Sequence, residues 1–398
     1  MSMKKVTESV FYIGADDKTL DLFESQYEIP DGVSYNSYII MDDKIAVMDT
    51  VDDRVTDSWM SNLKEVLKDR QPDYLIVSHL EPDHSDNVYR FMQEYPEAKI
   101  VGNAKTFAMM PQFFDIDLNE SGIADRLVTV KEGDQLSLGT HTLQFVMAPM
   151  VHWPEVMVEY EVSEQILFSA DGFGRFGALD GTLFEDEILG WEDEARRYFI
   201  NIVGKYGASV QALLKKAAGL NIRMICPLHG PMIQKDLGAY IEKYLTWSSY
   251  APEESGVLVA YASIHGNTEK AAEKLADILL EKGAKNVVLC DLARVDMAEA
   301  VSKAFQYDRL ALAGITYDGT LMPCMEDFLF HLKVKNFQKR KACIIENGSW
   351  GILSGKLMKD YLESMRNIEI CEHMVSIKTT LKKNQIAELE EMATELLA

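Results

Sequence analysis

Short apolar runs separated by turn-forming residues characterise the first 250 residues of the chain. They predict strands within the stretches 37–50, 74–79, 143–150, 157–162 and 166–171. Two segments with the apolar spacing of an amphipathic helix, 58–69 and 208–218, lie among them. The first part of the chain is therefore expected to mix strands and helices around its own core.

The pattern becomes regular after the polar stretch 247–255. Strands are predicted at 256–262, 286–292, 309–315 and 342–347, and helices over about 268–281, from about 323 and from about 385. Parallel strands need crossover helices on the faces of their sheet, so this alternation predicts a doubly wound parallel sheet. We expect two domains, residues 1–250 and residues 256–398.

Charge and composition restrict the partners. The formal net charge is −23, from 40 lysines and arginines against 63 aspartates and glutamates, and it disfavours nucleic acid and anionic membranes. Residues 1–14 lack the apolar core of a signal peptide, and no apolar stretch approaches the length of about 20 residues that spans a membrane. The five scattered cysteines include no C-x-x-C pair and are expected to be reduced packing residues. We expect a soluble, cytoplasmic protein.

Seven side chains of metal-binding type follow apolar runs in the first domain. Four of them, His79, Glu81, Asp83 and His84, come directly after the predicted strand at 74–78. The other three, His152, Asp171 and His229, each follow a further apolar run. Nitrogen and oxygen donors of these types suit first-row transition metals.

One such residue after a strand is more often a cap or a surface hydrogen-bonding group. Four strand ends with matching chemistry favour a metal site instead. Four histidines and three carboxylates suit two metals if one carboxylate bridges them, and Asp171 is the natural bridge because it stands alone on its strand end. The sequence therefore predicts a binuclear site.

A possible phosphate-binding loop follows the first strand of the second domain. It carries the hydroxyls of Ser263 and Thr268 and the start of a helix, which together can hold a phosphate without a cationic side chain. By itself such a loop is as often only a turn and a helix cap. Its candidate binding residues are Ser263, Ile264, His265, Gly266, Asn267 and Thr268.

Two more loops follow the third and fourth predicted strands, where doubly wound folds bind ligands. Each carries an aromatic residue that can lie against a flat ring system. No G-x-G-x-x-G fingerprint follows the first strand, so NAD is not expected. The candidate ring-binding residues are Thr316, Tyr317, Asp318 and Gly319 in one loop and Asn347, Gly348, Ser349, Trp350 and Gly351 in the other.

The ligand pattern H-x-[EH]-x-D-H with later His, Asp and His resembles the metallo-β-lactamase superfamily, whose fold is an αββα sandwich. Hydrolytic members carry histidine at the third motif position, where this chain has Glu81. Glutamate at this position is typical of the flavodiiron proteins, which the chain resembles over essentially its whole length. The resemblance also includes the runs H-W-P-E at 152–155 and S-A-D-G-F-G at 169–174 and the segment 195–206. The three loops of the second domain resemble those of flavodoxin, and FMN is the flavin that this resemblance implies.

The resemblance implies a non-haem di-iron site that reduces oxygen to water or nitric oxide to nitrous oxide, with electrons from FMN. It implies His79, Glu81, His152 and Asp171 at one iron, and Asp83, His84, Asp171 and His229 at the other. It also implies Tyr198 as a phenol near the irons, although a core tyrosine is about as common. Glu81 supplies a hard anionic oxygen, which favours iron and stabilises its ferric state.

The expected partners also come from the resemblance. They are a head-to-tail homodimer or a dimer of dimers, and an outside electron donor that is rubredoxin or a flavin-linked or NADH-linked reductase. Two alternatives stay open. One is a binuclear zinc hydrolase with a flavodoxin sensor domain, which Glu81 disfavours, and the other is an electron carrier with an inactive first domain, which the full ligand set disfavours.

Overall fold

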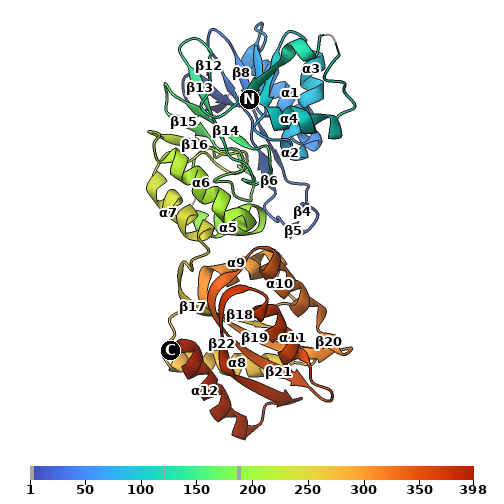
Figure 1. Cartoon of the computed structure of the whole chain (residues 1–398), viewed down its shortest axis with the longest axis vertical. Coiled ribbons are helices and arrows are strands. Elements are labelled where there is room, and N and C mark those ends of the chain that lie inside the picture. The colour runs from blue at the N-terminus through green and yellow to red at the C-terminus, as the bar shows by residue number, and fades with distance from the viewer. Residues whose placement is uncertain (1–3, 121, 186–189) are drawn as a thin grey trace. The chain divides into compact units, whose positions relative to one another are not determined.

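The computed structural model describes residues 4–120, 122–185 and 190–398 and divides into two compact units. The first unit comprises the chain up to Phe199 and Ala208–Tyr244, and the second comprises Ile200–Gly207 and Leu245–Ala398. Figure 1 shows the elements of both units along the chain.

Two β-sheets form the centre of the first unit. The seven-stranded sheet has the order β1 (Lys4–Lys5), β2 (Val10–Tyr12), β7 (Tyr38–Ile40), β8 (Ala46–Met48), β9 (Tyr74–Ile76), β10 (Lys99–Asn103), β11 (Leu127–Val130). The five-stranded sheet has the order β12 (Gln135–Ser137), β13 (Thr142–Met147), β14 (Met157–Glu161), β15 (Ile166–Phe168), β16 (Met224–Cys226). Two small ribbons pair β3 (Ala15–Asp17) with β6 (Val33–Tyr35) and β4 (Leu22–Phe23) with β5 (Tyr27–Glu28).

Helices cover the outer faces of these sheets (Figure 1). They are α1 (Thr56–Leu67), α3 (Val88–Glu94), α4 (Ala104–Met109), α5 (Trp191–Tyr198), α6 (Gly207–Ala217) and α7 (Leu237–Ser248), while the short α2 (Pro82–Ser85) belongs to the segment that follows β9. An apolar cluster joins the inner faces of the two sheets, with Tyr38 and Ile76 from one and Phe145 and Phe168 from the other. The expected αββα sandwich is confirmed.

The strand boundaries differ from the apolar runs in ways that matter for the site. The run 37–50 forms two antiparallel strands, β7 and β8, because a polar turn interrupts it. The strands β13 and β15 end at Met147 and Phe168, before the ends of the apolar runs that predicted them. The chain therefore has room to turn before it reaches His152 and Asp171.

The second unit contains a sheet with the strand order β18 (Val287–Asp291), β17 (Glu254–Tyr261), β19 (Tyr307–Tyr317), β21 (Gln338–Gly348), β22 (Arg366–Lys378). All four of these pairings are parallel, and the short β20 (Thr320–Leu321) adds to β19 in the antiparallel sense. In chain order this is 2-1-3-4-5, the flavodoxin arrangement. The expected doubly wound fold is confirmed.

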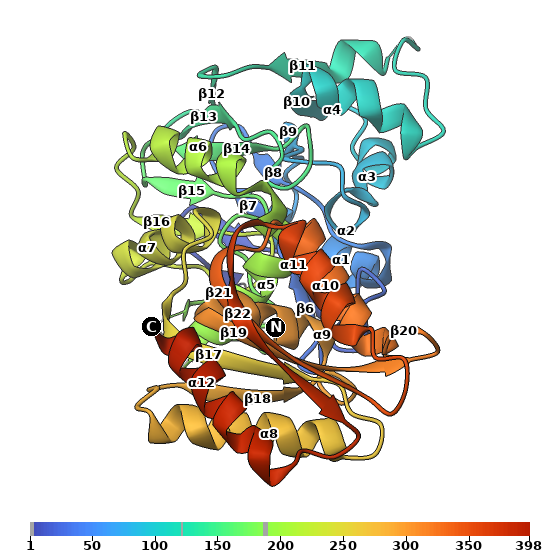
Figure 2. The same cartoon turned by 60° about the horizontal axis from the view of Figure 1, so that its bottom comes forward.

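Helices lie on both faces of this sheet, as Figure 2 shows. One face carries α8 (Asn267–Glu281) and α12 (Ile386–Leu397), and the other carries α9 (Met297–Gln306), α10 (Pro323–Val334) and α11 (Ser354–Glu363). The core under α8 and α12 contains Leu275, Leu279, Leu389 and Met392, all fully buried. In the part of the chain that the structure describes, no helix is long and apolar enough to cross a bilayer.

Candidate metal and flavin sites

The seven predicted ligand side chains come together at one edge of the two facing sheets. His79, Glu81, Asp83 and His84 follow β9, and His152 lies between β13 and β14. Asp171 follows β15, and His229 follows β16. The carboxyl ends of β9, β13, β15 and β16 therefore supply every member of the group.

Asp171 lies between two sets of ligands and faces each with a different oxygen atom. Its Oδ2 is 3.2 Å from Nε2 of His79 and 3.1 Å from Nε2 of His152. Its Oδ1 is 3.6 Å from Nε2 of His84 and 3.9 Å from Nε2 of His229. One carboxylate can therefore serve two cations at once.

Each set also has a carboxylate of its own. Glu81 Oε2 lies 2.8 Å from Nε2 of His152, on the Oδ2 side of Asp171. Asp83 Oδ2 lies 3.4 Å from Nε2 of His84 and 3.2 Å from Nε2 of His229, on the Oδ1 side. The seven side chains thus form two half-sites that share Asp171.

The polar atoms of this cluster are buried and lack ordinary partners. Nε2 of His79 and His152 and both carboxylate oxygens of Asp83 and Asp171 accept or donate no hydrogen bond within the described residues. Nε2 of His84 and Nε2 of His229 are 2.9 Å apart, at hydrogen-bonding distance, with the proton on one of the two rings. Buried polar atoms without partners are costly, and two cations would satisfy these carboxylate oxygens and unprotonated ring nitrogens together.

The pKa values of this cluster are strongly shifted from their usual values. Burial raises the pKa of Asp171, but His79 and His152 outweigh it and hold that pKa well below its usual value. Burial followed by the charge of Asp83 raises the pKa of Glu81 to about 7. Burial lowers the pKa of His84 to about 3, so this ring is neutral and its nitrogen is available as a ligand.

Two residues that the sequence did not single out hold the ligands in place. The backbone carbonyl of Ser34 accepts a hydrogen bond from Nδ1 of His229 at 2.8 Å, which directs Nε2 into the cluster. Glu155 is buried, and its Oε1 accepts a hydrogen bond from the Leu80 amide at 2.9 Å, inside the loop that carries four ligands. Glu155 stands in the H-W-P-E run, so a signal was present, whereas Ser34 had none.

A buried carboxylate pair lies behind the same loop and was also missed. The hydroxyl of Ser78 is 2.6 Å from Oδ2 of Asp49 and 3.1 Å from Oε2 of Glu159. A single hydroxyl proton can serve only one of these acceptors. Burial, as the largest cause, raises the pKa of Asp49 to about 6 and raises that of Glu159 well above its usual value, so the pair retains a proton.

Tyr198 lies beside the cluster at the end of α5. Its ring centroid is 5.6 Å from that of His229, and its hydroxyl is buried without a hydrogen-bond partner in the described structure. Burial, followed by the charges of Asp171, Asp83 and Glu81, raises its pKa well above 10. A Cβ on Gly174 would lie 2.8 Å from Cε1 of Tyr198, so the close approach of this ring requires glycine there.

The predicted flavin residues of the second unit line two adjoining cavities at the carboxyl edge of the sheet. The smaller, of about 60 Å³, is lined mainly by the loop after β17 and includes Ser263, Asn267 and Thr268. The larger, of about 750 Å³, is lined by the loops after β19 and β21, including Tyr317 and Trp350. Every predicted flavin residue except Gly266 lines one of them, and Ile315 and Thr379 are additional lining residues.

The small cavity has the chemistry of a phosphate site. Oγ of Ser263 is buried without a hydrogen-bond partner among the described residues, although Ser263 itself is only half-buried. Gly266 adopts φ +78°, and α8 begins after it without a side-chain cap. The first amides of α8 therefore remain available to an anion.

Two predicted flavin residues also connect the loops. Nδ2 of Asn347 donates to Oγ1 of Thr268 at 3.1 Å and to the carbonyl of Thr379 at 3.0 Å. Oγ1 of Thr316 accepts hydrogen bonds from the amides of Leu353 and Ser354 at 2.9 and 3.0 Å, where α11 begins. The two aromatic side chains, by contrast, are solvent-accessible, with Tyr317 45% and Trp350 85% exposed.

The comparisons with known proteins agree with this architecture. Residues 33–230 match the family model described as ODP family beta lactamase. A nitric oxide reductase of Moorella thermoacetica is 26% identical over 99% of this chain and 98% of its own length. Rubredoxin oxygen:oxidoreductase of Desulfovibrio gigas superposes with a TM-score of 0.92 at 24% identity, covering 99% of this chain and 98% of that one. A flavo di-iron protein of Thermotoga maritima, in mutant form, superposes with a TM-score of 0.88 at 22% identity over 99% of this chain and 98% of that one.

The fold and the two sites together define a class: a lactamase-like domain with a cluster of seven metal-binding side chains, joined in one chain to a flavodoxin-like domain. Over nearly its whole length the chain is similar in sequence to a nitric oxide reductase and similar in fold to flavodiiron proteins.

Proposed function

We propose that this protein is an oxidoreductase that reduces oxygen to water, nitric oxide to nitrous oxide, or both, at a non-haem di-iron site supplied with electrons through FMN. The observation that carries this proposal is the position of Asp171, whose two oxygens face two separate sets of buried ligands. The names of the Moorella and Desulfovibrio relatives, a nitric oxide reductase and an oxygen oxidoreductase, support the same reaction class.

We assign the ligands to two half-sites. His79, Glu81, His152 and Asp171 would hold one iron, and Asp83, His84, Asp171 and His229 the other. Both sets fit, because they offer buried nitrogen and oxygen atoms that lack partners in the described structure. A bound pair of irons supplies one-electron redox steps and a polarising charge for a diatomic substrate.

FMN would be held at the two cavities of the second unit. The hydroxyl of Ser263, the hydroxyl of Thr268 and the first amides of α8 suit its phosphate, and Tyr317 and Trp350 suit its ring system. The unpartnered Oγ of Ser263 is the observation of fit, since a phosphate oxygen would accept its proton.

The protein walls around the second half-site are aromatic. The ring centroid of Phe23 is 5.4 Å from that of His229, and the Tyr35 ring is 5.9 Å from His229 and 6.3 Å from His84. These rings would give the substrate apolar surroundings, which favour small uncharged gases. We further propose that the Tyr198 hydroxyl donates a hydrogen bond to the reacting diatomic, because it is buried beside His229 and has no described partner.

The partners and location are also proposals. Residues 1–398 include no C-x-x-C pair, and we propose rubredoxin or a flavin-linked or NADH-linked reductase as the donor. We propose a cytoplasmic head-to-tail homodimer, or a dimer of two such dimers, in which the flavin of one subunit serves the irons of the other. The domain limits proposed for truncation experiments are residues 1–250 and 256–398.

Metal analysis combined with gas turnover tests the proposal. The full-length chain, expressed with iron and zinc both available, should retain iron and FMN and should consume oxygen or nitric oxide repeatedly with reduced rubredoxin. Full zinc occupancy with hydrolase activity would support the hydrolase alternative instead. Oxidation that stops after one turnover would indicate an electron carrier.

A further inference from the structure

The hairpin formed by β4 and β5 lies against the proposed metal site. Phe23 and Tyr27, at the base of its turn, pair with each other and are 5% and 3% exposed. The Phe23 ring packs edge-on against the rings of His229 and Phe176, each with a centroid separation of 5.4 Å. The base of the hairpin is therefore anchored in the same core that holds the ligands.

The turn of this hairpin has an unusual composition for its conformation. The Gln26 amide donates to the Phe23 carbonyl at 3.1 Å, and the two central residues, Glu24 and Ser25, have φ values of +49° and +57°. Positive φ at both central positions of a β-turn is the feature of type I′ turns, which favour Asn-Gly. Left-handed φ costs about 1–2 kcal/mol for an ordinary residue, and such strain often marks a functional position.

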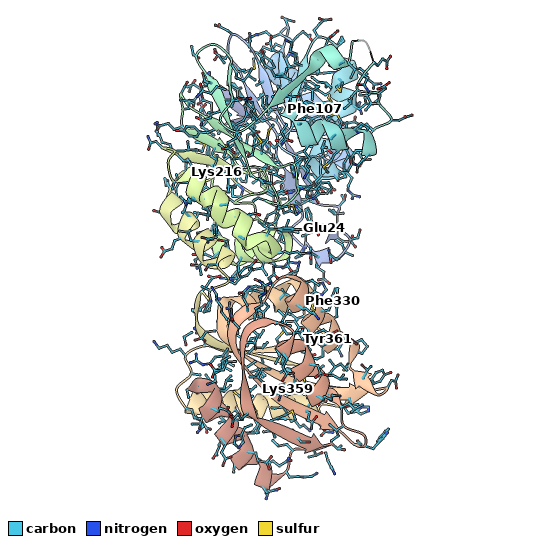
Figure 3. The ribbon with its side chains drawn as sticks, in the orientation of Figure 1. Glu24, Phe107, Lys216, Phe330, Lys359 and Tyr361 are labelled. Atoms are coloured by element: carbon cyan, nitrogen blue, oxygen red, sulfur yellow. The ribbon has the colours of Figure 1, made fainter. Side chains whose placement is uncertain are left out.

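The strained turn brings a carboxylate to the ligand cluster. One carboxylate oxygen of Glu24 and the ligand atoms of Glu81 and His152 all lie within 4.8 Å of one another. Two donors that bind one ion at about 2.1 Å are at most about 4.2 Å apart, so these three atoms need little movement to share an ion. Glu24, labelled in Figure 3, is exposed, whereas Glu81 and His152 are half-buried.

Nε2 of His152 gives a second indication of a ligand at this place, beside the grouping of the three side chains. The side chain of His152 is 10% exposed, and this nitrogen has no hydrogen-bond partner in the described structure. It is directed into the space that the carboxylates of Glu81 and Asp171 also border, at 2.8 and 3.1 Å. A cation there would be surrounded on the protein side by the four assigned ligands and on the solvent side by Glu24.

We propose that Glu24 is a further carboxylate ligand of the metal held by His79, Glu81, His152 and Asp171, and that it covers the solvent-facing side of that metal. The proposal rests on the proposed function, because it assumes that a metal occupies this half-site. A carboxylate in this position has two physical consequences. It slows escape of the metal to solvent, and its negative charge opposes the entry of small anions.

The test uses Glu24→Gln in the full-length, iron-loaded and FMN-loaded protein. The matched control is Glu28→Gln, which removes the same charge from an exposed residue of the same hairpin. Iron release to a chelator is followed by absorbance. Glu24→Gln should release one of the two irons about tenfold faster than wild type, by analogy with the 10–100-fold effects of altered metal surroundings, while Glu28→Gln should match wild type.

A second measurement uses azide as an anionic probe of the oxidised site. Glu24→Gln should bind azide several-fold more tightly. The reason is that a negative charge about 5 Å from the bound anion repels it by an energy that corresponds to a several-fold change in affinity. Ser25→Gly, which relaxes the turn and keeps the carboxylate, should leave both readings at the wild-type level. Wild-type behaviour of Glu24→Gln in both measurements, or equal effects in Glu28→Gln, would overturn the proposal.

The outcomes also separate this inference from the proposed function. If wild-type protein holds no iron, the proposed function fails irrespective of Glu24. If wild-type protein holds two irons and reduces either gas while Glu24→Gln loses iron at the wild-type rate, only the ligand role of Glu24 fails.

Discussion

Replacement of Ser263 by alanine should change flavin affinity and apoprotein stability in opposite directions. Oγ of Ser263 is buried at the small cavity and has no hydrogen-bond partner in the described structure. A buried unsatisfied hydroxyl costs about 1–3 kcal/mol. Ser263→Ala should therefore stabilise the flavin-free protein by up to about that amount.

The same substitution should weaken FMN binding. A hydrogen bond to a charged acceptor contributes about 1.5–3 kcal/mol, and each 1.36 kcal/mol is a factor of ten in affinity. The loss of the Ser263 hydroxyl should thus raise the FMN dissociation constant by about 10- to 150-fold. Riboflavin, which lacks the phosphate, should bind to wild type and Ser263→Ala with similar affinity.

Both effects can be measured in the full-length chain. Titration of apoprotein with FMN, followed by the quenching of flavin fluorescence, gives the affinity, and hydrogen exchange over residues 256–398 gives the stability of the flavin-free domain. Ser364→Ala is the control, because its exposed hydroxyl donates only to the Tyr361 carbonyl outside both cavities. Unchanged FMN affinity, or a less stable Ser263→Ala apoprotein, would refute the assignment of this hydroxyl to a phosphate.

Three other predictions follow from the first unit. Asp171→Ala removes the oxygens that face both half-sites, so metal analysis should show loss of both irons and gas-consumption assays should show no reductase activity. The FMN content should stay at the wild-type level. Loss of FMN as well would contradict two independent sites. Tyr198→Phe should stabilise the metal-free chain by about 1 kcal/mol in urea unfolding, since the buried hydroxyl lacks a described partner, and should lower turnover about 100-fold if that hydroxyl stabilises the transition state. Burial lowers the pKa of His141, but hydrogen bonds to Asp42 and Glu164 outweigh it and raise that pKa. The contribution of His141 to the free energy of unfolding is therefore full below pH about 6.5, and it is lost as the pH rises through the folded-state pKa. His141→Gln should therefore cost about 1–3 kcal/mol at pH 6 and less at pH 9, and an equal cost at both values would contradict the charged pairing.

The sequence already contained most of the local information about both sites. His79, Glu81, Asp83 and His84 follow one apolar strand within six residues, and a strand end holds such a loop rigidly whatever the rest of the fold does. The loop from Ser263 to Thr268 likewise forms between one strand and one helix. Interactions within a short stretch of chain determine these features, so they can be predicted from the order of residues.

One strand of the sheet in the second unit was not predicted from the pattern of apolar and polar residues, for a physical reason. β22 lies at an edge and pairs only with β21 among the strands of its sheet. Most of its residues are exposed or half-buried, and polar residues interrupt its apolar positions. An edge strand buries less surface than a central one, so its apolar signal is weak, and neighbouring strands rather than its own residues define it.

The tertiary structure alone decided how the ligands are shared and what supports them. Asp171 faces His79 with one oxygen and His84 with the other because two different sheets bring these strand ends together. Ser34 supports His229 from 195 residues away, and the turn that carries Glu24 reaches Glu81 only because Phe23 is packed into the core. Such contacts join residues far apart in the chain, so they depend on how the layers pack, and no local pattern of apolar and polar residues encodes them.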